Sequence, residues 1–186
     1  MKKITLSFLL CSLWALPLWA FDLEVGLQRS KPQIGYHTQT YQGESTNLTF
    51  QPDGEETILG RSVTLGIGFE NWLIETETAT YQTSTLMIDS QGNAVTLYPQ
   101  FQESRLGVFF RQDRELAGFF LGGGIENYQE QFTYLDSLYK NKGQAPYFKG
   151  GLALIFGAVR IRAEQVHSKI GQHNLKTNSI GLLLHF

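Results

Sequence analysis

Apolar and polar residues alternate with a period of two along most of the chain after residue 20. In residues 62–70, for example, Val63, Leu65 and Ile67 are separated by small or polar residues. Successive side chains of a β-strand point to opposite faces, so this period predicts strands with one apolar face. Eight such strands are predicted, over residues 21–28, 62–70, 72–80, 105–110, 117–125, 148–156, 159–164 and 179–186.

The connections between the predicted strands alternate in length. Short ones lie near Asn71, at 111–114 and at 157–158, and long polar ones cover 30–58, 84–95, 128–146 and 168–175. This alternation is typical of an up-and-down barrel with tight turns at one rim. The predicted fold class is all-β, an eight-stranded antiparallel up-and-down transmembrane β-barrel, because a closed sheet can pair its backbone groups within hydrocarbon.

Alternation alone does not say which face of the sheet is inside, since a soluble sandwich or barrel buries its apolar face. The polar face is rich in glycine and in charges of both signs, which suits a narrow lumen filled by side chains. We therefore predict an ion-pair network in the lumen, made of Glu24, Glu70, Glu75, Glu77, Arg105, Arg160, Arg162 and Glu164. Aromatic residues near strand ends predict interfacial girdles, made of Trp72, Tyr98, Tyr128 and Tyr147. Both features place the apolar face outward.

The chain ends on a strand pattern that contains Gly181, Leu182 and Leu184 and closes with Phe186. This ending is similar to the signal by which bacterial outer-membrane barrels are recognised by their insertion machinery. Over residues 21–186 the chain resembles the small eight-stranded outer-membrane barrels, among them outer-membrane proteins A and X and the opacity-type surface proteins. The resemblance implies the fold and a place in the outer membrane, with lipid and lipopolysaccharide as neighbours.

Residues 1–20 predict a secretory signal peptide, with Lys2 and Lys3 before an apolar stretch and a cut after Ala20. The stretch is too short to favour the alternative of an anchoring helix. The one cysteine, Cys11, lies inside this segment, which excludes a disulfide scaffold. The predicted domain is residues 21–186, exported through the periplasm. Its formal charge changes from -2 to -4 when the two lysines are removed, and it has no basic stripe that favours a nucleic-acid partner.

The candidates for catalysis are His167, Ser168 and Glu164, a set of the kind that activates a hydroxyl for acyl transfer. Lipid A deacylases of the barrel type carry a His and a Ser separated by one residue, whereas here they are adjacent and point to opposite faces of a strand. Three further sets of residues are candidates. His37 with Asp89 and Ser90 resemble residue types of the outer-membrane palmitoyltransferase. His167 and His173 form a weak metal pair, because they lack carboxylate or thiol partners, and His185 is expected in the lumen. No cofactor and no metal is expected.

The long connections are the expected contact surfaces. Residues 30–58 and 128–146 concentrate aromatic side chains, which mark either an extracellular ligand site or strand extensions whose aromatics pack together. Lys140, Lys142 and Lys149 are candidates to pair with lipopolysaccharide phosphates. The predicted function is a non-enzymatic role in surface contact or envelope integrity. The alternatives are a lipid A-modifying acyl hydrolase or transferase and a narrow, porin-like solute channel.

Overall fold

The computed structural model describes residues 21–35, 39–42, 47–57, 60–88, 92–170 and 173–186. The regular elements in these ranges are all strands: β1 (Asp22–Gly35), β2 (Gln39–Gln42), β3 (Asn47–Thr57), β4 (Gly60–Phe69), β5 (Trp72–Ile88), β6 (Ala94–Leu97), β7 (Gln100–Asp113), β8 (Ala117–Tyr134), β9 (Ser137–Phe156), β10 (Val159–Ile170) and β11 (His173–His185). The described residues contain no helix long and apolar enough to cross a membrane.

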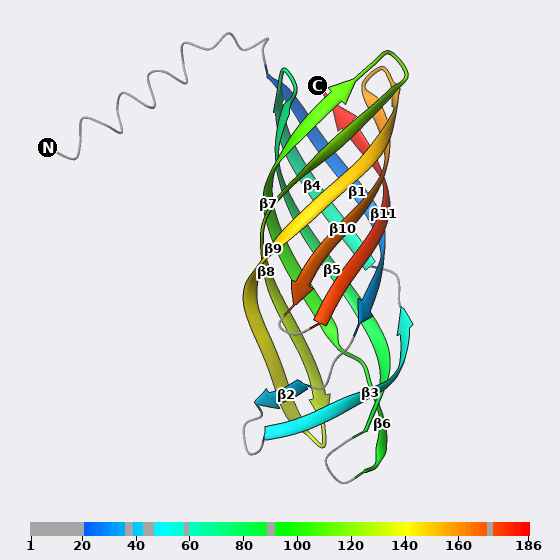
Figure 1. The fold of residues 1–186 in the computed structure, drawn as a ribbon. Helices are drawn as coiled ribbons and strands as arrows, with labels where there is room; N and C mark the ends of the chain where they lie inside the picture. The colour runs from blue at the N-terminus through cyan, green and yellow to red at the C-terminus, as the bar shows by residue number, and fades with distance from the viewer. Residues whose placement is uncertain (1–20, 36–38, 43–46, 58–59, 89–91, 171–172) are drawn as a thin grey trace, which may run out of the picture.

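Eight of these strands form a closed antiparallel barrel, in the order β1, β4, β5, β7, β8, β9, β10 and β11, with β11 pairing back onto β1 (Figure 1). The pairing register, followed once around the barrel from Asp22, returns to β1 at Pro32, ten residues further along. This stagger is the geometric counterpart of strands that tilt against the barrel axis. The predicted eight-stranded up-and-down barrel is confirmed.

The outer wall of the barrel carries an apolar belt. Along β4 the side chains alternate strictly between buried and exposed, and the exposed ones are mostly large and apolar. Leu27 and Leu152 are 69 % and 68 % exposed, respectively, while Arg105 and Lys149 are buried. This arrangement is the reverse of a water-soluble core. The belt residues are Leu23, Val25, Leu27, Val63, Leu65, Ile67, Phe69, Trp72, Ile74, Leu106, Val108, Phe110, Phe119, Leu121, Ile125, Phe148, Leu152, Leu154, Phe156, Ile161, Ile180, Leu182, Leu184 and Phe186.

The predicted long connections are largely strand. β8 and β9 continue the barrel wall as one hairpin, closed by a two-residue turn at Leu135 and Asp136, both with positive φ (47° and 61°). Residues 128–146 are therefore a β-hairpin, not a loop. Residues 30–58 contain the end of β1 together with β2 and β3, and β3 and β6 both pair with the extended β5. We call this part of the molecule, at the bottom of Figure 1, the extension.

The extension has its own aromatic core. Phe132 stacks on Tyr139 with ring centroids 5.4 Å apart, and Tyr81 stacks on Phe101 at 5.0 Å. These rings belong to a buried cluster together with Ile34, Met87, Leu97, Tyr128, Ala145 and Leu175. Of the two readings of the aromatic-rich connections, the described residues therefore support strand extension with internal packing.

A Phe132→Ala substitution tests whether this core holds the extension together. Removing a buried ring leaves a cavity and weakens the β8–β9 hairpin locally, so the backbone at the exposed Lys140 and Lys142 leaves the sheet more often and can enter a protease active site. We expect trypsin to cleave there about tenfold faster than in the wild type. Thr133→Ala, at an exposed neighbouring position, is the control. Equal cleavage rates for the two variants would contradict the role of this core.

Candidate functional site

The lumen of the barrel is filled by a network of buried ion pairs. Seven of the eight predicted lumen residues take part in it; the exception is Glu70. In the described part of the chain, the network joins the cations Arg105, Arg111, Lys149, Arg160 and Arg162 to the carboxylates Asp22, Glu24, Glu75, Glu77, Glu103, Asp113, Glu126 and Glu164. These charged residues come from β1, β5, β7, β8, β9 and β10.

Lys149 lies at the centre of the network. Its ammonium group is 2.7 Å from Glu75 Oε1, 2.8 Å from Glu77 Oε2 and 2.8 Å from Glu164 Oε1. An ammonium has three hydrogens to donate, so these three carboxylates from β5 and β10 use its full capacity. The side chain is completely buried, so among the described residues these three carboxylates neutralise its charge.

Arg162 connects this centre to the end of the lumen where the short turns lie. Its Nη1 is 2.6 Å from Glu75 Oε2, and its Nε is 2.8 Å from Glu164 Oε2. The guanidinium also lies over the ring of Phe120, 4.7 Å from the centroid, a cation–π arrangement. Arg162 thus shares two carboxylates with Lys149 and fixes their orientation.

A second cluster closes the lumen at the turn end. Arg160 Nη1 lies 2.9 Å from both Glu24 Oε1 and Asp113 Oδ2, and Arg111 Nη1 lies 2.8 Å from the same Glu24 oxygen. The cavity between these side chains measures about 10 Å³, space for about one water molecule. A solute would have to break these ion pairs to pass.

A third cluster lies at the opposite end of the lumen, next to the extension. Arg105 Nε is 2.6 Å from Glu126 Oε2, and its Nη1 is 3.4 Å from Glu77 Oε1. Glu103 pairs with the same guanidinium and accepts a hydrogen bond from the Tyr81 hydroxyl. Since Tyr81 also stacks on Phe101, this cluster leads directly into the aromatic core of the extension.

Several predicted residues lie elsewhere than expected. Glu70 is exposed in the turn between β4 and β5 with φ 50°, because the strand ends at Phe69 and the chain reverses there. Tyr128 and Tyr147 are 9 % and 6 % exposed, so they are not interfacial aromatics; strand parity puts them on the same inward face as Glu126 and Lys149. For the same reason Lys149 cannot reach a lipopolysaccharide phosphate.

The other predicted aromatics are on the outside. Trp72 is 46 % exposed and packs edge-on against Phe110, with centroids 6.0 Å apart, at the turn end of the belt. Tyr98 is 56 % exposed between β6 and β7. At the chain end, Leu182, Leu184 and Phe186 point outward while Gly181 faces inward, where a Cβ would lie 2.3 Å from Gln28 Cγ. Their role in insertion stays a prediction.

Sequence reasoning did not assign six network members: Asp22, Glu103, Arg111, Asp113, Glu126 and Lys149. Glu103, Arg111, Asp113 and Glu126 lie beyond the ends of the predicted strands, whereas Asp22 and Lys149 are the second residues of the strands predicted over 21–28 and 148–156. The signal that identifies them is the alternation of side chains along a strand, in which every second residue faces the lumen. Continued from Arg105, the inward set of β7 includes Glu103 and Arg111, and the inward set of β8 includes Glu126.

The three candidate catalytic residues do not come together. The His167 ring is exposed and lies 2.7 Å from Gln165 Oε1, on the outward face of β10. Ser168 faces inward, and Glu164 is held in the lumen by Lys149 and Arg162. An acyl-transfer triad requires contact between base and nucleophile, which adjacent residues of one strand cannot provide.

His167→Ala is therefore expected to leave lipid A unchanged. Mass spectra of lipid A from cells that express the wild type, the variant or no protein should show the same acyl pattern. An acyl change that depends on His167 would contradict this geometry and favour an enzyme.

Two other candidate sets lie partly or wholly outside what is described. His37, Asp89 and Ser90 fall outside the described residues, as does the side chain of His173.

His185 lies at the mouth of the lumen, as expected, with Nε2 2.7 Å from Asp22 Oδ2. Asp22, Glu24 and His185 have ligand atoms within 4.8 Å of one another, but Arg111 and Arg160 already neutralise both carboxylates. The described residues thus give no support for a metal at this mouth.

No family model matches this sequence, and no curated protein does. Solved structures do resemble it. Neisserial surface protein A matches with a TM-score of 0.60 at 10 % identity, covering 90 % of this chain and 97 % of the other. Ail, the attachment invasion locus protein of Yersinia pestis, determined in complex with the heparin analogue sucrose octasulfate, matches with 0.59 at 11 % identity, covering 89 % and 99 %.

The N-terminal β-barrel domain of Pseudomonas aeruginosa OprF also matches, with a TM-score of 0.51 at 9 % identity, covering 88 % of this chain and 97 % of the other. At such low identity these likenesses concern the fold. They extend over nearly the whole length of each barrel. The chain therefore has the fold of the small eight-stranded outer-membrane β-barrels, as its sequence predicts.

Proposed function

We propose that this chain is a bacterial outer-membrane protein, exported through the periplasm, whose barrel crosses the membrane and whose extension makes contacts outside the cell. The observation that carries the proposal is the inverted barrel, with its apolar side chains outward and its charges buried in the lumen. An apolar outer wall of this kind is stable in hydrocarbon and costly in water. The outward Leu182, Leu184 and Phe186 are proposed to serve the insertion machinery.

A rigid contact platform, without catalysis, is the role that the extension supports. β5, β7, β8 and β9 continue from the barrel into it, and side chains of these strands and of β6 contribute to one buried aromatic core. Surfaces held by such a core lose little conformational entropy on binding a partner. At the tip, Leu135 is 79 % exposed and is available for contact.

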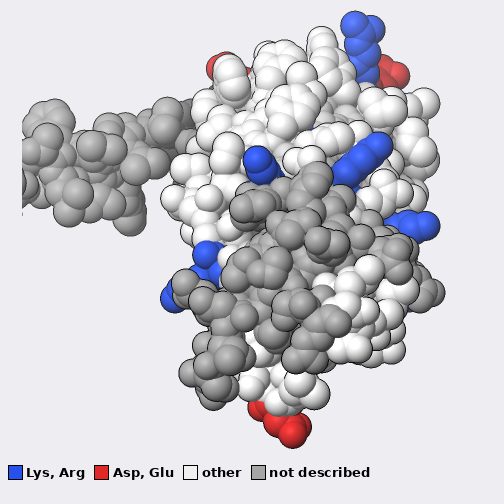
Figure 2. All heavy atoms as spheres, turned by 60° about the horizontal axis from the view of Figure 1, so that its bottom comes forward, with Lys and Arg blue, Asp and Glu red and all other residues white. Residues whose placement is uncertain are grey.

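The outer wall between the apolar belt and the extension is suited to binding lipopolysaccharide. Exposed positions there carry Arg29, Lys31, Arg61, Lys140, Lys142, Lys169 and Lys176, while Asp136 is exposed in the turn of the β8–β9 hairpin. Figure 2, seen toward the extension, shows Lys and Arg side chains at several places on the described surface and Asp and Glu side chains at a few places near its edge. Basic side chains at this height can pair with lipid phosphates.

Fractionation of cells that express the full-length chain tests the proposal. We expect the protein in the outer-membrane fraction, with a faster electrophoretic mobility before heating than after it, as a closed barrel stays compact in detergent. Recovery from the soluble periplasm would overturn the proposal, because the apolar belt would then face water.

A further inference from the structure

The outer wall of β5, β7 and β8 carries a cluster of uncharged amides next to the apolar belt, on the side of the extension. Register rows place Gln82, Gln100 and Gln131 side by side, and Thr80, Gln102 and Gln129 side by side in the row nearer the belt. All are outward-facing; Gln131 is half-buried and the other five are exposed. We call these six residues the amide face.

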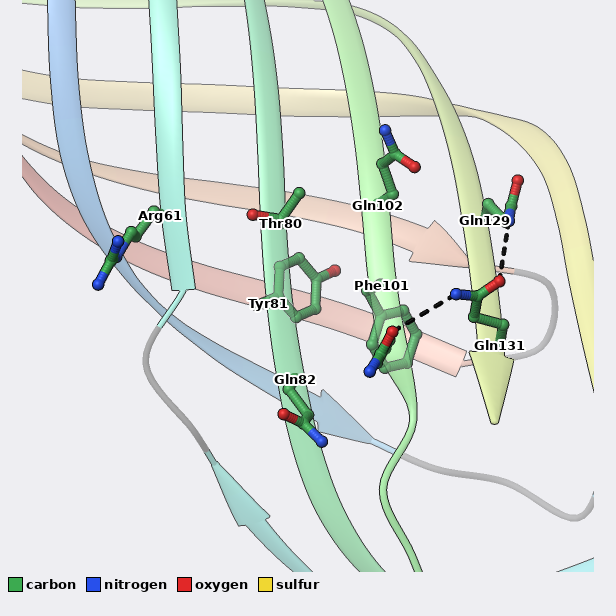
Figure 3. A pocket seen from close by; sticks show the side chains of 9 residues that line it. Arg61, Thr80, Tyr81, Gln82, Phe101, Gln102, Gln129 and Gln131 are labelled. Atoms are coloured by element: carbon green, nitrogen blue, oxygen red, sulfur yellow. Dashed lines mark hydrogen bonds between the residues drawn. The ribbon is translucent and has the colours of Figure 1, made fainter. Parts of the chain in front are cut away.

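The amide face lines a groove of about 420 Å³, which has Arg61 at one end (Figure 3). A second groove of about 290 Å³ shares Gln82, Gln100 and Gln131 and continues to Tyr98 and Leu138. The two form one track that leads away from the belt along the extension. An exposed tyrosine beside a row of amides offers both a flat apolar surface and hydrogen-bonding groups.

The amides of this face are available to a ligand. Gln129 donates to Gln131 at 3.3 Å and Gln131 donates to Gln100 at 3.4 Å, both long contacts. Gln82 and Gln102 make no side-chain hydrogen bond to any other described residue. Each amide offers two donors and an acceptor, a combination that matches the hydroxyl groups of a saccharide.

The membrane end of the track is cationic. Arg29 and Arg61 are directly opposite each other across β1 and β4, both exposed. Like charges in this position destabilise a sheet, and within the described ranges neither arginine forms an ion pair with a carboxylate. An anionic group bound between them would remove the repulsion, and phosphate fits guanidinium groups well.

On the belt side of the two arginines the outer wall is apolar. A groove of about 730 Å³ shares Arg61 and Thr80 with the track and is lined by Leu27, Val63, Ile180 and Leu182. Three chemistries thus follow one another along the wall, from belt to extension: apolar, cationic, and hydroxyl-binding. An occupant with the same order is a phosphorylated glycolipid, with its acyl chains in the membrane and its sugars outside.

We propose that this track is a binding site for the core saccharide of lipopolysaccharide, with a lipid A phosphate between Arg29 and Arg61 and the sugars on the amide face. The proposal rests on the outer-membrane location proposed above. It differs from a general attraction of basic residues for lipid, because the part that would hold the sugars is built of neutral amides.

Native mass spectrometry of the full-length protein in detergent tests the site with three probes: lipid A, rough lipopolysaccharide that carries the core, and the released core oligosaccharide. We expect the rough lipopolysaccharide to bind about tenfold more tightly than lipid A, the effect of a few added hydrogen bonds. Gln102→Ala/Gln129→Ala should abolish this preference and leave lipid A binding unchanged. Arg29→Gln/Arg61→Gln should weaken binding of both glycolipids.

The matched control is Gln33→Ala/Asn174→Ala, which removes two exposed amides from β1 and β11 on another part of the wall; it should bind as the wild type does. An amide-face variant that keeps the preference, or a control that loses it, overturns the site. A core oligosaccharide that binds as tightly as rough lipopolysaccharide also overturns it, in favour of a soluble glycan. Heat-dependent mobility, measured first for each variant, shows that the barrel is folded, and cell fractionation decides the outer-membrane location separately.

Discussion

Lys149→Met is expected to lower the free energy of unfolding by about 3–5 kcal/mol, the cost typical of removing one partner from a buried ion pair. The substitution leaves Glu75, Glu77 and Glu164 facing one another in a closed lumen without the ammonium group between them. Methionine has a similar length, so the loss of charge dominates over the loss of packing. The measurement is the urea midpoint of the protein refolded in phosphatidylcholine vesicles, followed by its heat-dependent mobility.

Lys142→Met is the matched control, since Lys142 is exposed on the same strand, β9. Surface substitutions of this type change stability by about 0.5 kcal/mol or less. If both variants unfold at the same urea concentration, Lys149 does not hold the lumen together and the network is only a space-filling arrangement.

Leu152→Arg should destabilise the protein in a bilayer by about 2–4 kcal/mol, the range for a basic residue near the midplane of a membrane barrel. Leu152 lies midway along the outward apolar positions of β9, between Leu154 and Phe148. In a soluble barrel the same exposed position would accept arginine with almost no cost. Equilibrium unfolding in vesicles therefore distinguishes the two environments.

The control for this measurement is Gln144→Arg, at an outward position of the same strand beyond the belt. Its stability should equal that of the wild type, because the side chain stays in water. A Leu152→Arg variant that is as stable as Gln144→Arg would mean that the belt does not face hydrocarbon.

The membrane part of the fold was predictable because its pattern is simple. Segments such as 62–70 alternate without interruption, and each has its apolar residues on one side. The lumen could be inferred from the same alternation, since Glu75, Glu77 and Arg162 have the parity opposite to the apolar residues. Glu70 was assigned wrongly because parity was continued one residue past the end of β4, into a turn.

The extension was not predictable in the same way, because the apolar residues change sides within a strand. On β8, Ile125 faces outward, whereas Tyr128 and Phe132 face inward. The change occurs where the surroundings of the wall change from lipid to water. The search for strands with one continuous apolar face stops at that point. Residues 84–95 and 128–146 were therefore predicted as connections and not as strands. The amide face was not predicted either, because in this region the outward residues are polar and the strands have no outward apolar face.

The buried charges of the lumen also constrain how the barrel can enter a membrane. Hairpin β8–β9, taken alone, would carry Glu126 and Lys149 into hydrocarbon without the strands that supply their partners. Each uncompensated ion would cost several kcal/mol. Stepwise insertion of single hairpins is thus unfavourable, and the lowest-energy route keeps the polar faces of the strands turned toward one another until β1 meets β11. Assembly and closure are, in this protein, one event.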